Sequence, residues 1–404
     1  MMKRYVSAVL AGVMLLLLAA GCGSKNAPQT DAEAPATILS EVTGIPGNKT
    51  VLTVGETEIP AEFYFYWLSY SCSSLEYYIL TNYDSSGLNS DCVNQEDGSI
   101  KWDASYMGIP LMDLVRAQAE DIVKFYVTVE ETAREHGADL TDDDRKALEE
   151  NYQTAAAEMG GEEAFAQYLA SMGVGRETFD RISAANYLQD NLKKQILTSG
   201  SDLYLSDEKC AEMASYMDHI LIANQDPDTG AALSDEEAAE KKKLAEELLE
   251  QIRTAEDPTA RFKELAEEYS EDPGRAQNPD GYVYTPNSLV SEVEEAAAAL
   301  KPGEISNLVE SQFGYHIILR QDLLAALAED ASLKDEIADS YLNDILTEKR
   351  DSLELTYDSC MDSVDWAQFY PAYIAAVEAL NAENDSAEPD AAGTETGSDT
   401  KAAS

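Results

Sequence analysis

Hydrophobic and polar positions follow a two-residue period near the start of the chain and a helical period over most of the rest. The alternation from Thr50 to Ile59 predicts a short hairpin. The stretch 61–80 carries aromatic residues on several faces, which predicts a helix packed in a core rather than one that lines a groove. Helical spacing returns after a polar, turn-rich insertion at 84–104. It predicts four further helices, at 111–135, 143–159, 162–172 and 176–197.

The pattern changes near Met217, where strands and helices begin to alternate. An apolar strand at 220–222 leads into a helix whose start is marked by a capping box of Ser234 and Glu237. A second amphipathic helix, an aromatic strand at 282–284, a third helix and a final strand at 315–319 follow. The order β-α-α-β-α-β describes a compact α/β module of about 100 residues, which is a common domain size.

The chain becomes helical again after Asp322 and keeps that pattern to residue 380. We therefore predict an α+β fold, in which the N- and C-terminal segments form one mostly helical domain. The α/β module is inserted into this domain, and its small antiparallel sheet is flanked by helices. The last stretch, 381–404, has no apolar periodicity and is predicted to be a disordered acidic tail.

Charge excludes one class of partner. The chain has 77 acidic and 28 basic residues, for a net charge of −49. Nucleic-acid binding needs clustered Lys and Arg, so we predict no nucleic-acid partner and an acidic, solvated surface. Acidic runs such as 142–144 lack the ligand spacing of a calcium loop. We predict neither a metal nor a cofactor.

The N-terminus has the pattern of an export signal. Lys3 and Arg4 precede an apolar run from Tyr5 to Ala20, which is too short and too closely followed by polar sequence for a spanning helix. The small residues before Cys22 resemble a bacterial lipoprotein signal. This resemblance implies a leader at 1–21, lipid attachment at Cys22 and a flexible tether at 22–45, with the protein anchored to the membrane outside the cytoplasm. The alternative is an ordinary cleaved signal.

Four cysteines remain after Cys22. They are Cys72, Cys92, Cys210 and Cys360, and no two form a C-x-x-C pair, so neither a zinc site nor a thioredoxin-like motif is predicted. In an exported protein Cys72 and Cys92 are candidates for a disulfide, although the sequence does not fix any pairing.

Three segments of the module resemble parvulin-type peptidyl-prolyl isomerases in order and spacing. They are the strand His219-Ile220-Leu221-Ile222, the stretch from Phe262 to Asp272, and the stretch from Gly303 to Ile318, which contains the string Phe-Gly-Tyr-His-Ile-Ile. Each string is short, but the three together in this order are specific.

The resemblance implies a catalytic polar cluster of His219, Asp272 and His316. The chain has three histidines, and two of them fall at the positions that face each other across central strands in this family. The two-residue period of a strand puts Leu221 on the face of His219 and Ile318 on the face of His316. The alternatives are a pair of satisfied core histidines and a carboxylate that caps a loop.

The resemblance also implies where the proline ring of a substrate binds, and it assigns substrate binding to Tyr284, Leu289, Val293 and Phe313. The chain departs from the family pattern in two places. The usual Gly-Gly-Asp-Leu-Gly before the aromatic strand is reduced at 279–282, and the frequent Phe at the Val293 position is a smaller side chain. Lost apolar contact amounts to roughly 1 to 3 kcal/mol, so we expect low activity.

The order of signal, cysteine, helical region, module and helical return resembles PrsA-type foldase lipoproteins, with a helical region similar to that of SurA. This implies a chaperone domain from 46–210 and 323–380 and an isomerase domain at 211–322, which acts on X-Pro bonds of unfolded exported proteins. The alternative is a holdase that keeps the parvulin fold with little or no catalysis. A solute-binding lipoprotein would need repeated βα units, which are not found. The sequence does not fix the oligomeric state.

Overall fold

The computed structural model describes three stretches of the chain, residues 37–82, 90–226 and 229–387. The predicted leader at 1–21 and lipid attachment at Cys22 lie outside these residues, as do most of the predicted tether and most of the predicted tail. Within the three stretches, none of the helices is both long enough and apolar enough to cross a membrane.

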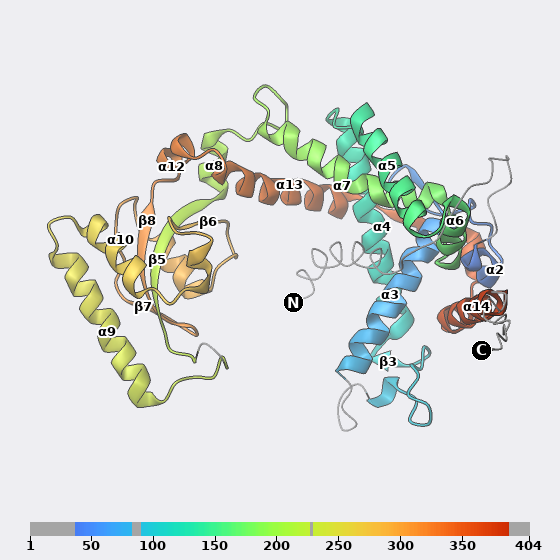
Figure 1. The fold of residues 1–404 in the computed structure, drawn as a ribbon, viewed down its shortest axis with the longest axis horizontal. Helices are drawn as coiled ribbons and strands as arrows, with labels where there is room; N and C mark the ends of the chain where they lie inside the picture. The colour runs from blue at the N-terminus through green and yellow to red at the C-terminus, as the bar shows by residue number, and fades with distance from the viewer. Residues whose placement is uncertain (1–36, 83–89, 227–228, 388–404) are drawn as a thin grey trace, which may run out of the picture. The chain divides into compact units, whose positions relative to one another are not determined.

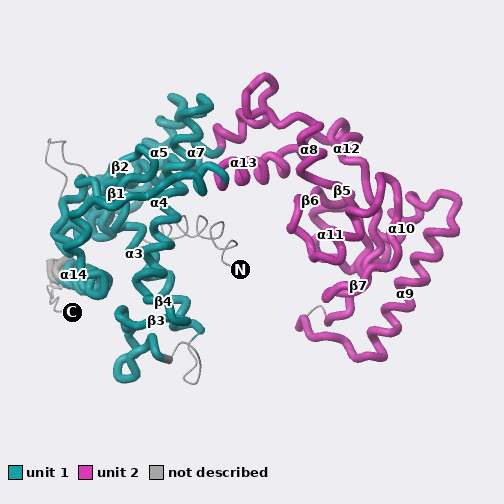
Figure 2. Tube along the Cα trace, turned by 180° about the vertical axis from the view of Figure 1, so that it is seen from behind, with its two compact units in different colours: residues 1–189, 348–404 teal, residues 190–347 magenta. Residues whose placement is uncertain are grey.

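Two compact units make up the chain, and Figure 2 colours them separately. Residues 1–189 and 348–404 form the first unit, and residues 190–347 form the second. Helix α7 (Arg176–Leu197) leads from the first unit into the second, and helix α13 (Leu333–Ser352) leads back (Figure 1). The predicted ends of the isomerase domain, 211 and 322, fall inside the second unit.

Helices dominate the first unit, and the hairpin and the helices predicted between residues 50 and 197 agree with the structure to within one residue at each end. Its helices are α2 (Ile38–Thr43), α3 (Ala61–Thr81), α4 (Leu111–Glu135), α5 (Asp142–Glu158), α6 (Glu162–Ser171) and α14 (Trp366–Ala387), with 3-10 helices η3 (Ser90–Cys92) and η5 (Ser359–Ser363). Its strands are β1 (Thr50–Val54), β2 (Thr57–Pro60), β3 (Ser105–Tyr106), β4 (Ile109–Pro110) and β9 (Leu355–Tyr357).

The aromatic helix α3 forms the centre of this unit. Phe63, Tyr64, Phe65 and Trp67 are buried, and Trp67 lies 5.3 Å from the ring of Tyr126 on α4. Aromatic pairs at such distances add to the free energy gained by burying the rings. The prediction that this helix packs in a core is confirmed.

Strand β9 joins the C-terminal part of the chain to this core. It pairs antiparallel with β1, with Thr356 opposite Thr53, and the sheet order is β2-β1-β9. The hydroxyl of Tyr357 also lies 3.0 Å from that of Tyr64. The prediction of helix throughout 323–380 is therefore wrong at β9, because pairing with a distant strand outweighs the local helical pattern.

Two segments that the sequence assigns to flexible regions are helical. Helix α2 lies in the predicted tether, since Ile38 and Leu39 are apolar and both are buried. Helix α14 continues to Ala387, past the predicted start of the tail at 381, because neither Gly nor Pro occurs between Pro371 and Ala387.

The cysteines of the described chain are all free thiols. Cys72, Cys92 and Cys210 are buried, and Cys360 is half-buried. The candidate disulfide between Cys72 and Cys92 is therefore not formed.

The second unit contains the α/β module. Its helices are α8 (Asp207–Met213), α9 (Asp235–Thr254), α10 (Pro258–Tyr269), α11 (Ser291–Ala298) and α12 (Leu323–Glu329), with the 3-10 helix η4 (Pro273–Ala276). Its strands are β5 (Ser215–Ala223), β6 (Tyr282–Tyr284), β7 (Val309–Ser311) and β8 (Gly314–Gln321). The strands form one antiparallel sheet in the order β6-β5-β8-β7, which confirms the predicted fold class. The predicted element order lacks β7, a three-residue strand without the aromatic pattern that marks the equally short β6.

Helices cover both faces of this sheet with separate apolar clusters. On one face, Ile220 of β5 and Ile317 of β8 pack against α9 and α10. On the other face, Met217 and Ile318 pack against α11 through Val293. The capping box of Ser234 and Glu237 begins α9 as predicted. Alternate residues of β5 and β8 thus belong to different layers.

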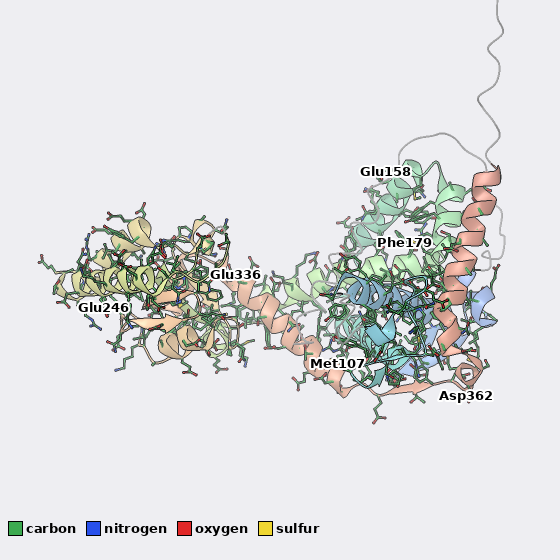
Figure 3. The ribbon with its side chains drawn as sticks, turned by 90° about the horizontal axis from the view of Figure 1, so that it is seen from below. Met107, Glu158, Phe179, Glu246, Glu336 and Asp362 are labelled. Carbon is green, nitrogen blue, oxygen red and sulfur yellow. The ribbon has the colours of Figure 1, made fainter. Side chains whose placement is uncertain are left out.

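Apart from the buried Glu131 and Asp218, the acidic side chains of the described chain are at least partly exposed. Glu158 on α5, Glu246 on α9 and Glu336 on α13 are exposed examples that Figure 3 labels. This distribution agrees with the solvated acidic surface expected from the net charge of −49.

Gly314, at the start of β8, offers a test of how tightly β5 and β8 pair. Its φ is 144°, and a Cβ there would lie 2.2 Å from the carbonyl oxygen of Ile222. Because the contact is with backbone, we expect Gly314→Ala to lower the free energy of unfolding of the second unit by about 2 to 4 kcal/mol. Urea unfolding followed through the amide NMR signals of β8 measures the loss.

Gly303→Ala is the matched control for this substitution. Gly303 also has a positive φ, 84°, but a Cβ there would meet no atom within 4 Å. It should cost only about 1 kcal/mol, the price of the left-handed backbone alone. Equal losses in the two variants would contradict the tight β5–β8 contact.

Candidate active site

The pairing of β5 with β8 brings two histidines together on one face of the sheet. His219 pairs with Ile318, and Leu221 pairs with His316, so the four side chains share a face as predicted. The two imidazoles are stacked, with ring centroids 5.3 Å apart, and their Nδ1 atoms are separated by 3.2 Å. His316 is only 3% exposed.

Asp272 reaches the histidines because the segment before it is hydrogen-bonded to β5. The amide of Glu271 donates to the carbonyl of Leu221 at 2.8 Å, and the Glu271 carboxylate accepts from the amide of Ala223 at 2.7 Å. The hydroxyl of Ser270 also accepts from the amide of Leu221. These bonds occupy the edge of β5 beyond the end of β6, and they place the next residue, Asp272, beside His219.

The carboxylate of Asp272 has three hydrogen-bond donors. Its Oδ2 lies 3.2 Å from Nε2 of His219 and also accepts from the hydroxyl of Tyr282. Its Oδ1 accepts from the backbone N–H of Gly274 at 3.3 Å, which caps η4. The carboxylate therefore caps the loop and also joins the histidine cluster, so the two interpretations of Asp272 are compatible.

Ser311 closes the other end of the cluster. Its hydroxyl lies 2.8 Å from Nε2 of His316 and accepts from the backbone N–H of Phe313 at 3.1 Å. Ser311 lies on β7, the strand absent from the predicted order. The four side chains Asp272, His219, His316 and Ser311 thus form one continuous hydrogen-bonded chain.

The partners at the two ends fix the positions of the protons. An ionised Asp272 accepts only, so His219 carries its proton on Nε2 and its Nδ1 is an acceptor. His316 must then donate from Nδ1, which leaves its Nε2 to accept from the Ser311 hydroxyl. Every donor in this chain meets an acceptor while both imidazoles are neutral.

The pKa shifts agree with this assignment. Burial lowers the pKa of His316, and the neighbouring His219 lowers it further, to about 4. Burial raises the pKa of Asp272, but the hydrogen bonds from His219 and Tyr282 together outweigh burial and bring it to about 2. Burial and the bond to Asp272 raise the pKa of Tyr282 above its usual value. The phenol therefore stays protonated and the carboxylate ionised.

A buried ion pair lies one residue before His219. Asp218 is 1% exposed and its carboxylate lies 2.7 Å from the guanidinium of Arg275. Burial raises the pKa of Asp218, although Arg275 opposes this shift. Arg275 belongs to η4, the 3-10 helix that begins directly after Asp272. Its positive charge is balanced by the carboxylate of Asp218.

The predicted substrate-binding residues lie in two different environments. Tyr284, Leu289 and Val293 belong to one apolar cluster with Ile318, and Tyr284 and Val293 are only 6% and 2% exposed. Phe313, in the turn between β7 and β8, is 43% exposed and lies outside that cluster.

Two residues that contact the histidines and Asp272, namely Tyr282 and Ser311, could not be predicted from the sequence. Tyr282 stands in the predicted aromatic strand, but no local signal shows that its hydroxyl meets Asp272. Ser311 precedes the string that carries the family resemblance, and its place opposite His316 depends on the unpredicted β7. Among the described residues, no group of three or more His, Cys, Asp and Glu side chains could hold a metal ion.

The fold and the paired histidines define a parvulin-type peptidyl-prolyl isomerase domain. Residues 219–322 match the family model for the rotamase, or PPIC-type PPIase, domain. The module is therefore a peptidyl-prolyl isomerase domain of this type.

Similarity to known proteins extends beyond the module. The chain is 29% identical over 220 residues to the foldase protein PrsA of Staphylococcus aureus strain bovine RF122 / ET3-1, a match that covers 53% of this chain and 64% of that protein. The chain thus spans less than two thirds of this relative's length.

Solved structures similar to the chain include PrsA from Bacillus subtilis, at 18% identity and a TM-score of 0.21, over 76% of this chain and 96% of that one. NmPin, the parvuline of Nitrosopumilus maritimus, is 29% identical with a TM-score of 0.20, over 27% of this chain and 97% of that one.

The buried position of His316 predicts how it titrates. The NMR signals of His316 should keep their neutral-imidazole shifts between pH 7 and pH 5 and change near pH 4, below the ordinary value of 6.5. Because the unfolded chain binds the proton first as the pH falls from 6.5 to 4, the stability of the second unit decreases over this range. This one group contributes a slope of at most about 1.4 kcal/mol per pH unit.

Histidine-selective isotope labelling of the full chain measures this titration, and substitution of each histidine assigns the three signals. The same chain in concentrated urea is the control, in which His316 should titrate at its ordinary value. A His316 that titrates near pH 6.5 in the folded chain would contradict the neutral hydrogen-bonded chain described above.

Proposed function

We propose that this protein is a membrane-anchored foldase that accelerates cis/trans isomerisation of X-Pro bonds in unfolded exported proteins. The observation that carries this proposal is the closed chain of Asp272, His219, His316 and Ser311 in a PPIC-type domain. The similarity to a protein named foldase supports the cellular role.

The reaction requires neither a nucleophile nor a cofactor. Rotation about an X-Pro bond is slow because the twisted amide loses its resonance, across a barrier of about 20 kcal/mol. A site accelerates it by binding the twisted amide more tightly than the planar one. The twisted amide is less polar, so a pocket that keeps its carbonyl away from water favours it.

The proposed role of His219, Asp272 and His316 is to fix the polar side of this pocket. In the proposed arrangement both imidazoles are neutral, and each has a hydrogen-bond partner at both of its ring nitrogens. The negative charge of Asp272 lies next to Nε2 of His219. A planar amide concentrates negative charge on its carbonyl oxygen, and the charge of Asp272 disfavours that distribution when the oxygen faces His219. No proton needs to leave any of these groups.

The proposed apolar side of the pocket comprises Tyr284, Leu289, Val293 and Phe313. Phe313 is the exposed member, and it is fixed to the polar chain by its backbone bond to Ser311. A proline ring that packs on Phe313 would therefore lie next to the His316 end of the cluster.

One observation favours a second candidate, a holdase with weak catalysis. Val293 and Tyr284 are buried in one apolar cluster with Ile318. A ring that binds there must first separate these contacts, which opposes binding. A protein that binds unfolded segments through other surfaces would not meet this cost.

The first test is an X-Pro isomerisation assay by NMR exchange on the full chain. We expect acceleration, and we expect His219→Ala and Asp272→Ala each to reduce it by at least about tenfold, since each breaks the fixed hydrogen-bonded chain. Amide spectra of each variant establish that the second unit remains folded.

His136→Ala is the matched control, because it removes the remaining histidine from the first unit. Its activity should equal that of the parent. If the folded parent chain gives no acceleration but suppresses aggregation of an unfolded protein, the holdase candidate replaces the isomerase.

The proposed lipid anchor has a separate test. Cys22→Ser should move the chain from the membrane fraction to the soluble fraction of a bacterial host, because the thiol that would carry the lipid is lost. Fractionation and intact mass of the purified chain measure this change. Cys360→Ser is the control and should stay in the membrane fraction; a Cys22→Ser chain that also stays there would contradict the anchor.

A further inference from the structure

The phenol of Tyr282, on β6, is a third donor to the Asp272 carboxylate beside His219 and the backbone amide of Gly274. Its hydroxyl donates to Oδ2, the same oxygen that His219 approaches at 3.2 Å. Its ring also meets the His219 ring edge-on, with centroids 5.6 Å apart and an interplanar angle of 88°. Tyr282 therefore contacts both members of the Asp272–His219 pair.

The backbone fixes where Tyr282 stands. It pairs with Met217 on β5, two residues before His219 and on the same face. The residues before it are held by the hydroxyl of Tyr216, which donates to the carbonyl of Asp280 at 2.9 Å. Gly281 has a φ of 112°, and a Cβ there would lie 2.4 Å from the carbonyl oxygen of Met217. The chain approaches β5 closely at this point and directs the next side chain onto the site face.

Gly274 leaves the space that the phenol occupies. A Cβ at Gly274 would lie 2.5 Å from the hydroxyl oxygen of Tyr282, but 3.4 Å from the nearest ring carbons, which is ordinary contact. The backbone of Gly274 has no positive φ that would disfavour a side chain. A side chain at position 274 would therefore clash with the hydroxyl of Tyr282 but not with its ring.

We propose that Tyr282 is a positioning residue of the isomerase site, which fixes the Asp272 carboxylate against His219 and thereby holds His219 in its Nε2–H tautomer. This proposal rests on the proposed isomerase function for its consequence in activity. The position of the carboxylate itself does not depend on that function.

The physical basis is the freedom of a carboxylate with fewer donors. With Tyr282 in place, Oδ2 has two donors and Oδ1 has the Gly274 amide. Without the phenol, the carboxylate is held by one imidazole and one long backbone bond of 3.3 Å. It can then rotate and take up water, and the tautomer of both imidazoles is less strongly fixed.

The test compares two Tyr→Phe variants of the full chain. We expect Tyr282→Phe to lower kcat/KM for an X-Pro peptide about tenfold, mainly through kcat. We also expect the 15N chemical shifts of both ring nitrogens of His219 to change, because a smaller fraction of this imidazole is in the Nε2–H tautomer. Tyr269→Phe is the control: Tyr269 lies three residues before Asp272, but its phenol interacts with Glu268. It should change neither measurement.

A double-mutant cycle with Gly274→Ala tests the same contact from the other side. In the parent, the added methyl group displaces the hydroxyl, so Gly274→Ala should reproduce the tenfold loss and the tautomer change. In the Tyr282→Phe background the hydroxyl is absent, and the same substitution should have little further effect.

The outcomes separate this proposal from the proposed function. Equal effects of Gly274→Ala in both backgrounds, or a His219 tautomer unchanged in Tyr282→Phe, would overturn the positioning role. If the parent chain shows no isomerase activity, the proposed function fails, but the tautomer and the coupling between 274 and 282 still decide whether Tyr282 positions the carboxylate.

Discussion

The register between β5 and β8 determines nearly everything else in the second unit. Each of these strands supplies two layers, because alternate side chains point to opposite faces. Ile220 and Ile317 enter the layer under α9 and α10, while His219 and His316 point to the face under α11. A slip of either strand by one residue would move that strand's histidine into the apolar layer and its isoleucine, Ile220 or Ile317, into the site. The apolar packing that stabilises the sheet therefore also aligns the two imidazoles.

The aligned imidazoles form a polar chain that is satisfied from end to end. At one end a backbone amide, that of Phe313, anchors Ser311, and at the other the amide of Gly274 anchors Asp272. A buried polar network stabilises a fold only when its members find partners, and this chain meets that condition with neutral imidazoles. The same arrangement suits a reaction in which no proton is transferred, since nothing in it has to ionise during turnover.

The sequence predicted the parts of this arrangement that depend on local pattern. Helices with regular apolar spacing, such as α4 and α7, were predicted nearly to the residue, and the family strings identified His219, Asp272 and His316. Strands β7 and β9 were missed because neither has the aromatic pattern that marks the equally short β6, and each is stabilised by a partner elsewhere in the chain. Tyr282 and Ser311 were missed for the related reason that their hydroxyl partners depend on the three-dimensional pairing. The resemblance could not have supplied Tyr282, because the chain departs from the family pattern at that point.

The polar and apolar sides of the module differ in how ready they are for a substrate. The polar chain is complete, with its donors and acceptors paired within the protein. On the apolar side, Val293 and Tyr284 are buried against Ile318, and Phe313 alone of the predicted contacts is exposed. In the proposed site, binding of a proline ring would therefore separate apolar contacts before it made new ones, while the polar groups would keep their positions. The smaller side chain at Val293 reduces the apolar contact that would compensate for this. In such a site the rate at low substrate concentration is limited by binding rather than by the fixed polar groups, so a low kcat/KM would not imply that His219, Asp272 and His316 are poorly arranged.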